Sequence, residues 1–254
     1  MFNLVNANPI PGYFNPPNFL PIFYLEDWNN NEYSTYDTKK RFEDNLKAKG
    51  NKWHYARTKV YYNNNKDGYR APEWNTVDWA NSVVVFGCSN VTGIGLAEEE
   101  TITSQLSKMI NRPVINLGAP STSIDFSFFN SLILAEKYPT PYAVVHLWTS
   151  IDRFTRFRQT EMEHLGIWNY EKDNFYTDYV SDTYQTIMNG KMISMASRNL
   201  WKDKSRYYAA SFFDITAHYM ECDRIEVDNE ARDLLHPGRL KAAETAQLIA
   251  ENIT

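Results

Sequence analysis

The chain has 254 residues and a formal net charge of −5, from 31 acidic and 26 basic side chains. A chain of this length can bury a domain-sized core, and an acidic balance gives no reason to expect a nucleic-acid partner. The sequence contains neither a long apolar run nor a basic segment followed by a short apolar one, so we expect no membrane span and no signal peptide. Two cysteines, Cys88 and Cys222, do not make a disulfide framework.

The first 80 residues are expected to form an N-terminal arm or subdomain, rich in proline and aromatic residues. Residues 1–28 contain five prolines among Phe, Tyr and Leu. Such a segment is neither a regular helix nor a central strand, and it is too aromatic for a solvated tail. We expect it to lie extended on a surface, either of its own domain or of a partner chain. Residues 38–49 have helical character, and residues 53–62 are a candidate strand.

Residues 81–254 alternate between strand-like and helix-like patterns, which is typical of a parallel sheet covered by helices on both faces. The expected strands are 82–86, 113–117, 142–148, 207–213 and 224–227. The expected helices are 98–110, 124–136, one or two within 177–201, and 239–252, with a loop at 156–175. The fold class predicted is a three-layer α/β/α sandwich with a mostly parallel five-stranded sheet.

Ser89 is the strongest candidate for chemistry, because it lies in the turn that follows the first strand of this sheet. Such turns border the ligand crevice of an open α/β sheet, and a serine there can act as a nucleophile if a histidine takes its proton. Among five histidines, only His236 has an acidic residue three positions upstream, Asp233, and Pro-Gly directly after it. Asp233 can hold the ring at Nδ1 while Nε2 faces the serine.

Three motifs, in this order along the chain, together resemble the SGNH (GDSL-type) hydrolase superfamily. They are Gly87-Cys88-Ser89, Asn116-Leu117-Gly118 after the second strand, and Asp233-x-x-His236-Pro237. The resemblance covers about residues 81–254. It implies a flavodoxin-like sheet and a serine esterase, with Ser89 as nucleophile, His236 as general base and Asp233 as the acid that orients it.

The resemblance also implies where the oxyanion formed during ester hydrolysis is bound. The family uses the N–H of the serine, a glycine N–H after the second strand and an asparagine side chain after the third. Here the glycine position falls on Ser121 rather than Gly118, and a serine still offers a backbone N–H. The asparagine position falls on Ile151, whose side chain donates nothing. The candidate substitutes beside it are Thr149, Ser150 and Arg153, of which a guanidinium would be the strongest donor.

Other residues of chemical interest are expected to be structural. His146 lies within the third strand and is expected to be a satisfied interior histidine, and Cys88 a small buried residue. Asp125 and Asp152 are expected to be cap or loop carboxylates. Neither histidines nor carboxylates have a metal-ligand spacing such as His-x-x-x-His, so no metal and no cofactor is expected.

Three functions remain open at this point. The first is a serine esterase, with O-acetyl groups of a carbohydrate as a candidate substrate. The second is a catalytically weakened module that serves a larger assembly such as a phage particle as a structural or glycan-binding part; the N-terminal arm and Ile151 favour it. The third is a cytoplasmic esterase or thioesterase acting on small acyl groups. The expected location is accordingly the cytoplasm or a phage virion.

Overall fold

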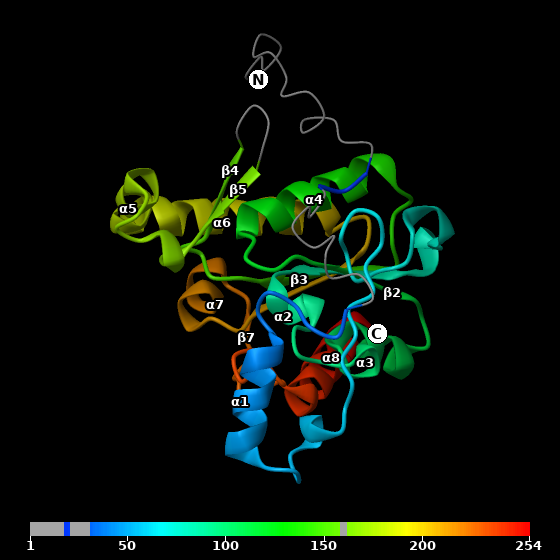
Figure 1. Cartoon of the computed structure of the whole chain (residues 1–254). Coiled ribbons are helices and arrows are strands. Elements are labelled where there is room, and N and C mark those ends of the chain that lie inside the picture. Colours follow the sequence, from blue (N-terminus) through cyan, green and yellow to red (C-terminus); the bar gives the residue numbers. More distant parts are fainter. Residues whose placement is uncertain (1–17, 21–30, 158–161) are drawn as a thin grey trace.

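The structure is a computed structural model, and it describes residues 18–20, 31–157 and 162–254 (Figure 1). Five parallel strands form its central sheet in the order β2-β1-β3-β6-β7. The strands are β1 (Val83–Gly87), β2 (Val114–Gly118), β3 (Ala143–Trp148), β6 (Arg206–Ser211) and β7 (Asp223–Arg224). The expected parallel five-stranded sheet is confirmed, although β7 has only two residues.

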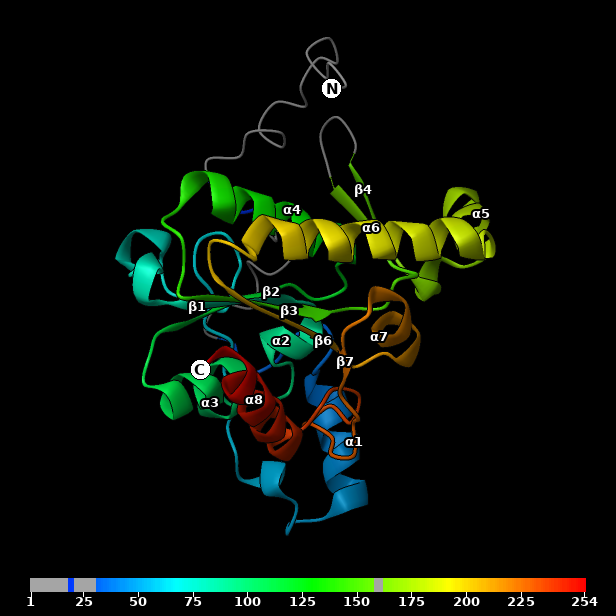
Figure 2. The same cartoon turned by 180° about the vertical axis from the view of Figure 1, so that it is seen from behind.

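Helices cover both faces of the sheet, which gives the expected three layers (Figures 1 and 2). One layer holds α4 (Ile124–Lys137) and α6 (Thr183–Trp201), and the other holds α3 (Ile102–Ile110) and α8 (Arg239–Ile253). The remaining helices are α1 (Lys39–Lys49), α2 (Ser89–Thr92), α5 (Asn174–Ser181) and α7 (Asp214–Met220).

The sequence of β1 explains why it can lie at the centre of these layers. Successive side chains of a strand point to opposite faces. Val84 and Phe86 accordingly pack in the core beneath α4 and α6, while Val83 and Val85 pack in the core with α3 and α8. Every residue of β1 is buried. A strand that is apolar at every position is what a sheet covered on both faces requires.

The described part of the first 80 residues shares this core. Phe19, Tyr62 and Trp74 belong to the same cluster of buried side chains as Val84 and Phe86. Phe19 and Leu20 of the proline-rich segment therefore pack against this chain's own core; the expectation for the rest of residues 1–28 lies outside the described residues. The boundary near residue 80 stays a prediction, while the packing joins both parts in one core.

The candidate strand at 53–62 is wrong. The chain forms a 3-10 turn at His54–Ala56, and only Tyr62 makes a β-bridge, to Asn31. The two ends of the segment pack in different cores: Tyr55 packs with α3 and α8, whereas Val60 and Tyr62 pack with α4 and α6. Side-chain alternation alone did not reveal that the backbone turns between them.

The loop expected at 156–175 is also corrected, because it contains a β-hairpin and a helix start. Strands β4 (Phe154–Phe157) and β5 (Met162–Leu165) pair antiparallel. Arg156 lies opposite Glu163 in this pair and forms an ion pair with it at 2.6 Å, a cross-strand contact that favours pairing. A 3-10 turn at Ile167–Asn169 follows, and α5 begins at Asn174.

Smaller differences concern helix boundaries. The helix expected at 98–110 is divided into a 3-10 turn at Glu98–Glu100 and α3, because Thr101 is extended and caps α3 by accepting a hydrogen bond from the N–H of Ser104. The helix α7 directly after β6 was not anticipated. Further 3-10 turns lie at Trp74–Thr76 and Trp79–Asn81.

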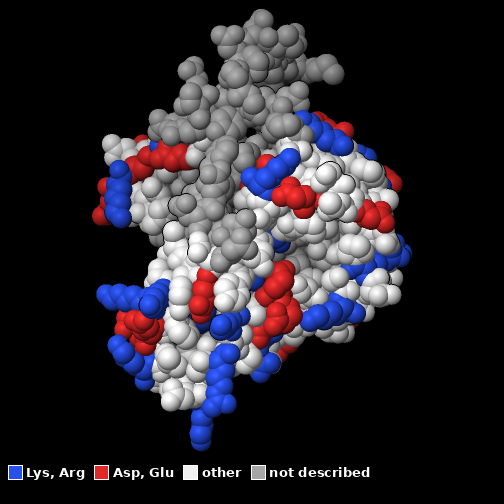
Figure 3. Space-filling model, turned by 45° about the vertical axis from the view of Figure 1, so that its right-hand side comes forward, with Lys and Arg blue, Asp and Glu red and all other residues white. Residues whose placement is uncertain are grey.

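The outer surface carries both signs of charge. On the face shown in Figure 3, acidic and basic side chains are interspersed. Within the described residues, none of the helices combines the length and the apolar character needed to span a bilayer.

Candidate active site

Ser89 lies where the sequence predicts, at the carboxyl end of β1. It is the first residue of the single-turn helix α2 and is 8 % exposed. The N–H groups of a first helical turn have no partner within the helix, so the N–H of Ser89 can serve an anion beside its own side chain. The strand order places β1 between β2 and β3, where the chain reverses its direction of winding, and such a switch point is where open α/β sheets bind ligands.

Asn116 and Gly118 hold α2 in place on the sheet. A Cβ atom on Gly118 would lie 2.3 Å from the backbone nitrogen of Thr92, so a side chain there would push α2 away. Asn116 Nδ2 donates to the carbonyl of Val91 (2.8 Å), and its Oδ1 accepts from the N–H of Gly118 (2.9 Å). Since Asn116 engages the N–H of Gly118, these two residues position Ser89 by fixing the helix that it begins.

Asp233 and His236 form the hydrogen-bonded pair that the sequence predicts. His236 Nδ1 lies 2.5 Å from Asp233 Oδ2, and Asp233 Oδ1 accepts the N–H groups of Leu235 and His236, both at 3.2 Å. Asp233 is 1 % exposed. Three hydrogen bonds hold this buried carboxylate in place, and a fixed acceptor at Nδ1 directs the other ring nitrogen, Nε2, outward.

Gly95 brings this loop against the segment that follows α2. Its φ is +76°, and a Cβ atom would lie 3.0 Å from the nitrogen of Arg232 and 3.2 Å from that of Asp233. The carbonyl of Gly95 also accepts the N–H of Arg232 (3.2 Å). A glycine is needed here both for its backbone conformation and for the close approach.

Within the part of the chain that the structure describes, Ser89 and His236 are not hydrogen-bonded to each other. The partner of Ser89 Oγ is the sulfur of Cys88, 3.9 Å away. Catalytic hydrogen bonds are often long in the ligand-free state and tighten when substrate binds. Cys88 is buried, as expected.

Ser121, the predicted glycine-like donor, has a backbone conformation that fits this role. Its φ is +59°, in the left-handed region that favours glycine. Strained conformations of this kind persist where the surroundings enforce them, and they cluster at functional sites. Ser121 Oγ is hydrogen-bonded to the hydroxyl of Tyr36, a residue that the motifs did not indicate.

The segment after β3 places Ile151 away from the site. Its side chain packs with Ile124, Trp148 and Ile193 between α4 and α6, and its N–H donates to Thr216 Oγ1 at 3.0 Å. Neither group of Ile151 can therefore donate to an oxyanion.

The other candidates in this segment have separate surroundings. The guanidinium of Arg153 lies over the rings of Trp168 (5.3 Å) and Phe213 (5.8 Å). Thr149 is buried, and Ser150 is half-buried with its carbonyl accepting the N–H of Arg153. The structure does not bring Arg153 into contact with Ser89, so the substrate-binding roles of Ser150 and Arg153 stay predictions.

His146 is interior, but the expectation that it is satisfied is wrong. Within the described residues, neither ring nitrogen has a hydrogen-bond partner. The ring stacks on Phe86 (4.9 Å between centroids) and Trp148 (4.2 Å). Burial lowers the pKa of His146 to about 3, because the charged ring would lose its hydration. His146 is therefore a neutral aromatic packing residue.

Asp125 and Asp152 occupy the structural places expected of them. Asp125 lies in the first turn of α4 and accepts a hydrogen bond from Asn189 (3.0 Å), and burial raises its pKa. Asp152 lies in the loop after β3 and accepts from the hydroxyl of Tyr176 (3.3 Å).

The N-terminal part contributes contacts to the site that no sequence motif indicated. The ring of Tyr36 meets that of His236 edge-on, with centroids 6.5 Å apart. Next to it, Asp37 forms an ion pair with Arg232 at 2.6 Å, and both side chains are wholly inaccessible. Tyr62 also donates to Asp37 (2.9 Å). The one hint in the sequence was a charged residue, Arg232, directly before the predicted triad acid.

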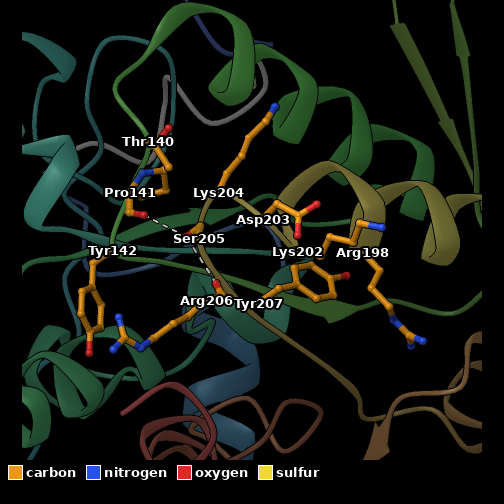
Figure 4. Close-up of a pocket in the computed structure, with 10 residues that line it drawn as sticks. All are labelled: Thr140, Pro141, Tyr142, Arg198, Lys202, Asp203, Lys204, Ser205, Arg206 and Tyr207. Atoms are coloured by element: carbon orange, nitrogen blue, oxygen red, sulfur yellow. Dashed lines mark hydrogen bonds between the residues drawn. The ribbon is translucent and has the colours of Figure 1, made fainter.

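The pocket drawn in Figure 4 lies at the amino ends of β3 and β6, whereas Ser89 follows the carboxyl end of β1. Ser205 Oγ donates to the carbonyl of Pro141 across it (2.8 Å). Its charged lining residues are Arg198, Lys202, Asp203, Lys204 and Arg206. None of the predicted site residues lines this pocket, so it is a separate feature of the surface.

No protein-family model and no curated protein sequence matches this chain. Solved structures do resemble it. The chain is similar to GDSL-type (SGNH) hydrolases. The structure of a protein named TesA has 12% identity to this chain and a TM-score of 0.44, with 68% of this chain and 99% of that chain covered. A member of the lipolytic G-D-S-L family from Veillonella parvula has 11% identity and a TM-score of 0.39, with 67% of this chain and 96% of that chain covered.

An acetyl xylan esterase from Butyrivibrio proteoclasticus has 9% identity and a TM-score of 0.44, with 68% of this chain and 63% of that chain covered. The resemblance expected from the three sequence motifs is thus also found among solved structures. At these values the likenesses assign no role to any residue of this chain, and the chemistry depends on the residues described above.

Proposed function

We propose that this protein is a serine hydrolase that cleaves an ester bond, with Ser89, His236 and Asp233 as its triad. The observation that carries the proposal is the hydrogen bond of 2.5 Å between His236 Nδ1 and the buried Asp233. A buried carboxylate that fixes the tautomer of a histidine is needed when that histidine must accept a proton at Nε2. The serine at the end of β1 is the group whose proton it would accept.

In the proposed reaction, Ser89 Oγ attacks the ester carbonyl carbon while His236 Nε2 takes the hydroxyl proton. The N–H groups of Ser89 and Ser121 donate to the oxyanion of the tetrahedral intermediate. His236 then gives its proton to the departing alkoxide, which leaves as the alcohol. A water molecule, deprotonated by His236, attacks the acyl-serine; the acid leaves and Ser89 regains its proton.

We further propose an alcohol of carbohydrate type as the leaving group, because His236 must protonate that group and a polar hollow of about 510 Å³ adjoins His236. An aromatic face beside polar and charged side chains suits a sugar, which stacks its C–H face and hydrogen-bonds its hydroxyls. The lining residues that supply these groups are Trp53, Lys49, Asp228, Asn229 and Glu230. O-acetyl groups are the first acyl groups to test.

The experiment compares the wild type with Ser89→Ala on p-nitrophenyl acetate and on acetylated xylo-oligosaccharides. We expect acetate release by the wild type on both substrates and a loss of at least 10³-fold in kcat for Ser89→Ala, because the nucleophile is removed. Ser181→Ala, a change at an exposed position of α5, serves as the matched control and should behave as the wild type. Equal rates for the wild type and Ser89→Ala on every ester would reject the proposal.

A further inference from the structure

After β3 the proposed hydrolase has Ile151 at the position where the family has its asparagine donor, and the roles of Ser150 and Arg153 in that segment stay predictions. Two N–H groups remain, from Ser89 and Ser121, while the side chain and N–H of Ile151 are both engaged elsewhere. Preorganised donors account for a large part of catalysis in ester and amide hydrolysis. A third donor from another part of the chain would be an alternative to the candidates directly after β3.

Tyr36, in the N-terminal part, contacts two residues of the proposed site. Its hydroxyl is hydrogen-bonded to Ser121 Oγ, and its ring edge meets the ring of His236. The hydroxyl therefore lies next to the residue that offers a backbone N–H to the oxyanion, on the side of the catalytic base.

Hydrogen bonds hold the turn that carries Tyr36. Its carbonyl accepts a hydrogen bond from Arg41 Nη1 (2.7 Å), and Ser34 Oγ accepts the N–H groups of Tyr36 (3.2 Å) and Asp37 (2.9 Å). The buried pair of Asp37 with Arg232 then ties this turn to the residue directly before Asp233. One ion pair thus positions both the Tyr36 turn and the triad acid.

We propose that the hydroxyl of Tyr36 is the third oxyanion donor of the site and takes the place of the asparagine that the chain lacks. Before substrate binds, the Tyr36 hydroxyl and Ser121 Oγ are hydrogen-bonded to each other. When the tetrahedral intermediate forms, the phenol donates a hydrogen bond to its oxyanion. This inference rests on the proposed ester hydrolysis.

The test measures kcat and KM for p-nitrophenyl acetate in wild type, Ser89→Ala and Tyr36→Phe. Tyr184→Phe is the control, since Tyr184 is 84 % exposed. Removal of one oxyanion donor in a well-studied protease lowers kcat about 10²–10³-fold, so we expect Tyr36→Phe to lower kcat about 10²-fold and to change KM by less than about 3-fold. A boronic acid that mimics the tetrahedral anion should bind Tyr36→Phe weaker by a similar factor.

A second variant, Ser121→Ala, keeps the backbone N–H and removes only the Oγ that orients Tyr36; it should lower kcat about 10-fold. A wild-type kcat in Tyr36→Phe would overturn the Tyr36 inference and leave the hydrolase intact. A rise in KM of Tyr36→Phe without a fall in its kcat would also overturn it, because that result would indicate a role in substrate binding. If the wild type is no faster than Ser89→Ala, the hydrolase proposal fails and this one fails with it.

Discussion

Asp233→Asn should lower kcat for p-nitrophenyl acetate about 10⁴-fold without unfolding the protein. The carboxylate accepts a hydrogen bond from His236 Nδ1 at 2.5 Å, whereas an amide can present its NH₂ group there and favour the tautomer with its proton on Nε2. That tautomer cannot accept the proton of Ser89. The same substitution in a serine protease triad costs about 10⁴ in kcat.

The measurement is steady-state hydrolysis together with thermal unfolding of both proteins. Asp178→Asn, at an exposed position of α5, is the matched control and should have wild-type kinetics. A loss smaller than 10-fold for Asp233→Asn, in a protein that remains folded, would show that Asp233 does not orient the catalytic base.

Arg232→Met should lower the free energy of unfolding by about 3–5 kcal/mol, because it leaves the Asp37 carboxylate buried without its partner. Both side chains of this pair are wholly inaccessible, and Arg232 Nη2 lies 2.6 Å from Asp37 Oδ2. Tyr62 remains as a donor to Asp37 but carries no charge. The pair also links the Tyr36 turn to Asp233, so the variant should lose activity as well.

The stability cost of Arg232→Met should depend on pH through the buried carboxyl group of Asp37. Burial raises its pKa even with Arg232 in place, and removal of the guanidinium raises it further. A carboxyl group whose pKa is higher in the folded than in the unfolded state favours folding at low pH, and this contribution is lost as the pH rises. The cost of Arg232→Met should therefore be smaller at pH 5 than at pH 8, in urea unfolding at both values.

Two further variants sharpen this prediction. Asp37→Leu combined with Arg232→Met should recover a large part of the lost stability, since apolar side chains replace a buried pair at little cost. Arg224→Met breaks an exposed pair with Asp214 of the same length, 2.6 Å, and should cost less than about 1 kcal/mol. A similarly small cost for Arg232→Met would contradict the account of the pair.

The parts of the fold and site that could be predicted from sequence are those encoded locally. The strand before Ser89 is apolar at successive positions, and Asp233 lies three residues before His236, so one loop contains the whole acid–base pair. The turn at Ser121 was also predictable, through its spacing from Asn116. In each case the residues that cooperate are close in the chain or are joined by one sheet register.

The rest depends on contacts between distant segments. Tyr36 meets Ser121 and His236 across the fold, and no pattern around Tyr36 indicates this. The pairing of Arg232 with Asp37 is hidden in the same way. Residues 53–62 were predicted as a strand from their alternating aromatic, aliphatic and charged residues, although Tyr55 and Tyr62 are buried in two different cores.

The central claim is that Ser89 is a nucleophile activated by His236, and covalent labelling with a fluorophosphonate tests it most directly. Intact-mass spectrometry and peptide mapping should find one adduct per chain, on Ser89. Ser89→Ala should carry none, and His236→Ala should react at least 10²-fold more slowly. A protein that stays unlabelled at saturating reagent, or that is labelled elsewhere while Ser89 is free, would contradict the account.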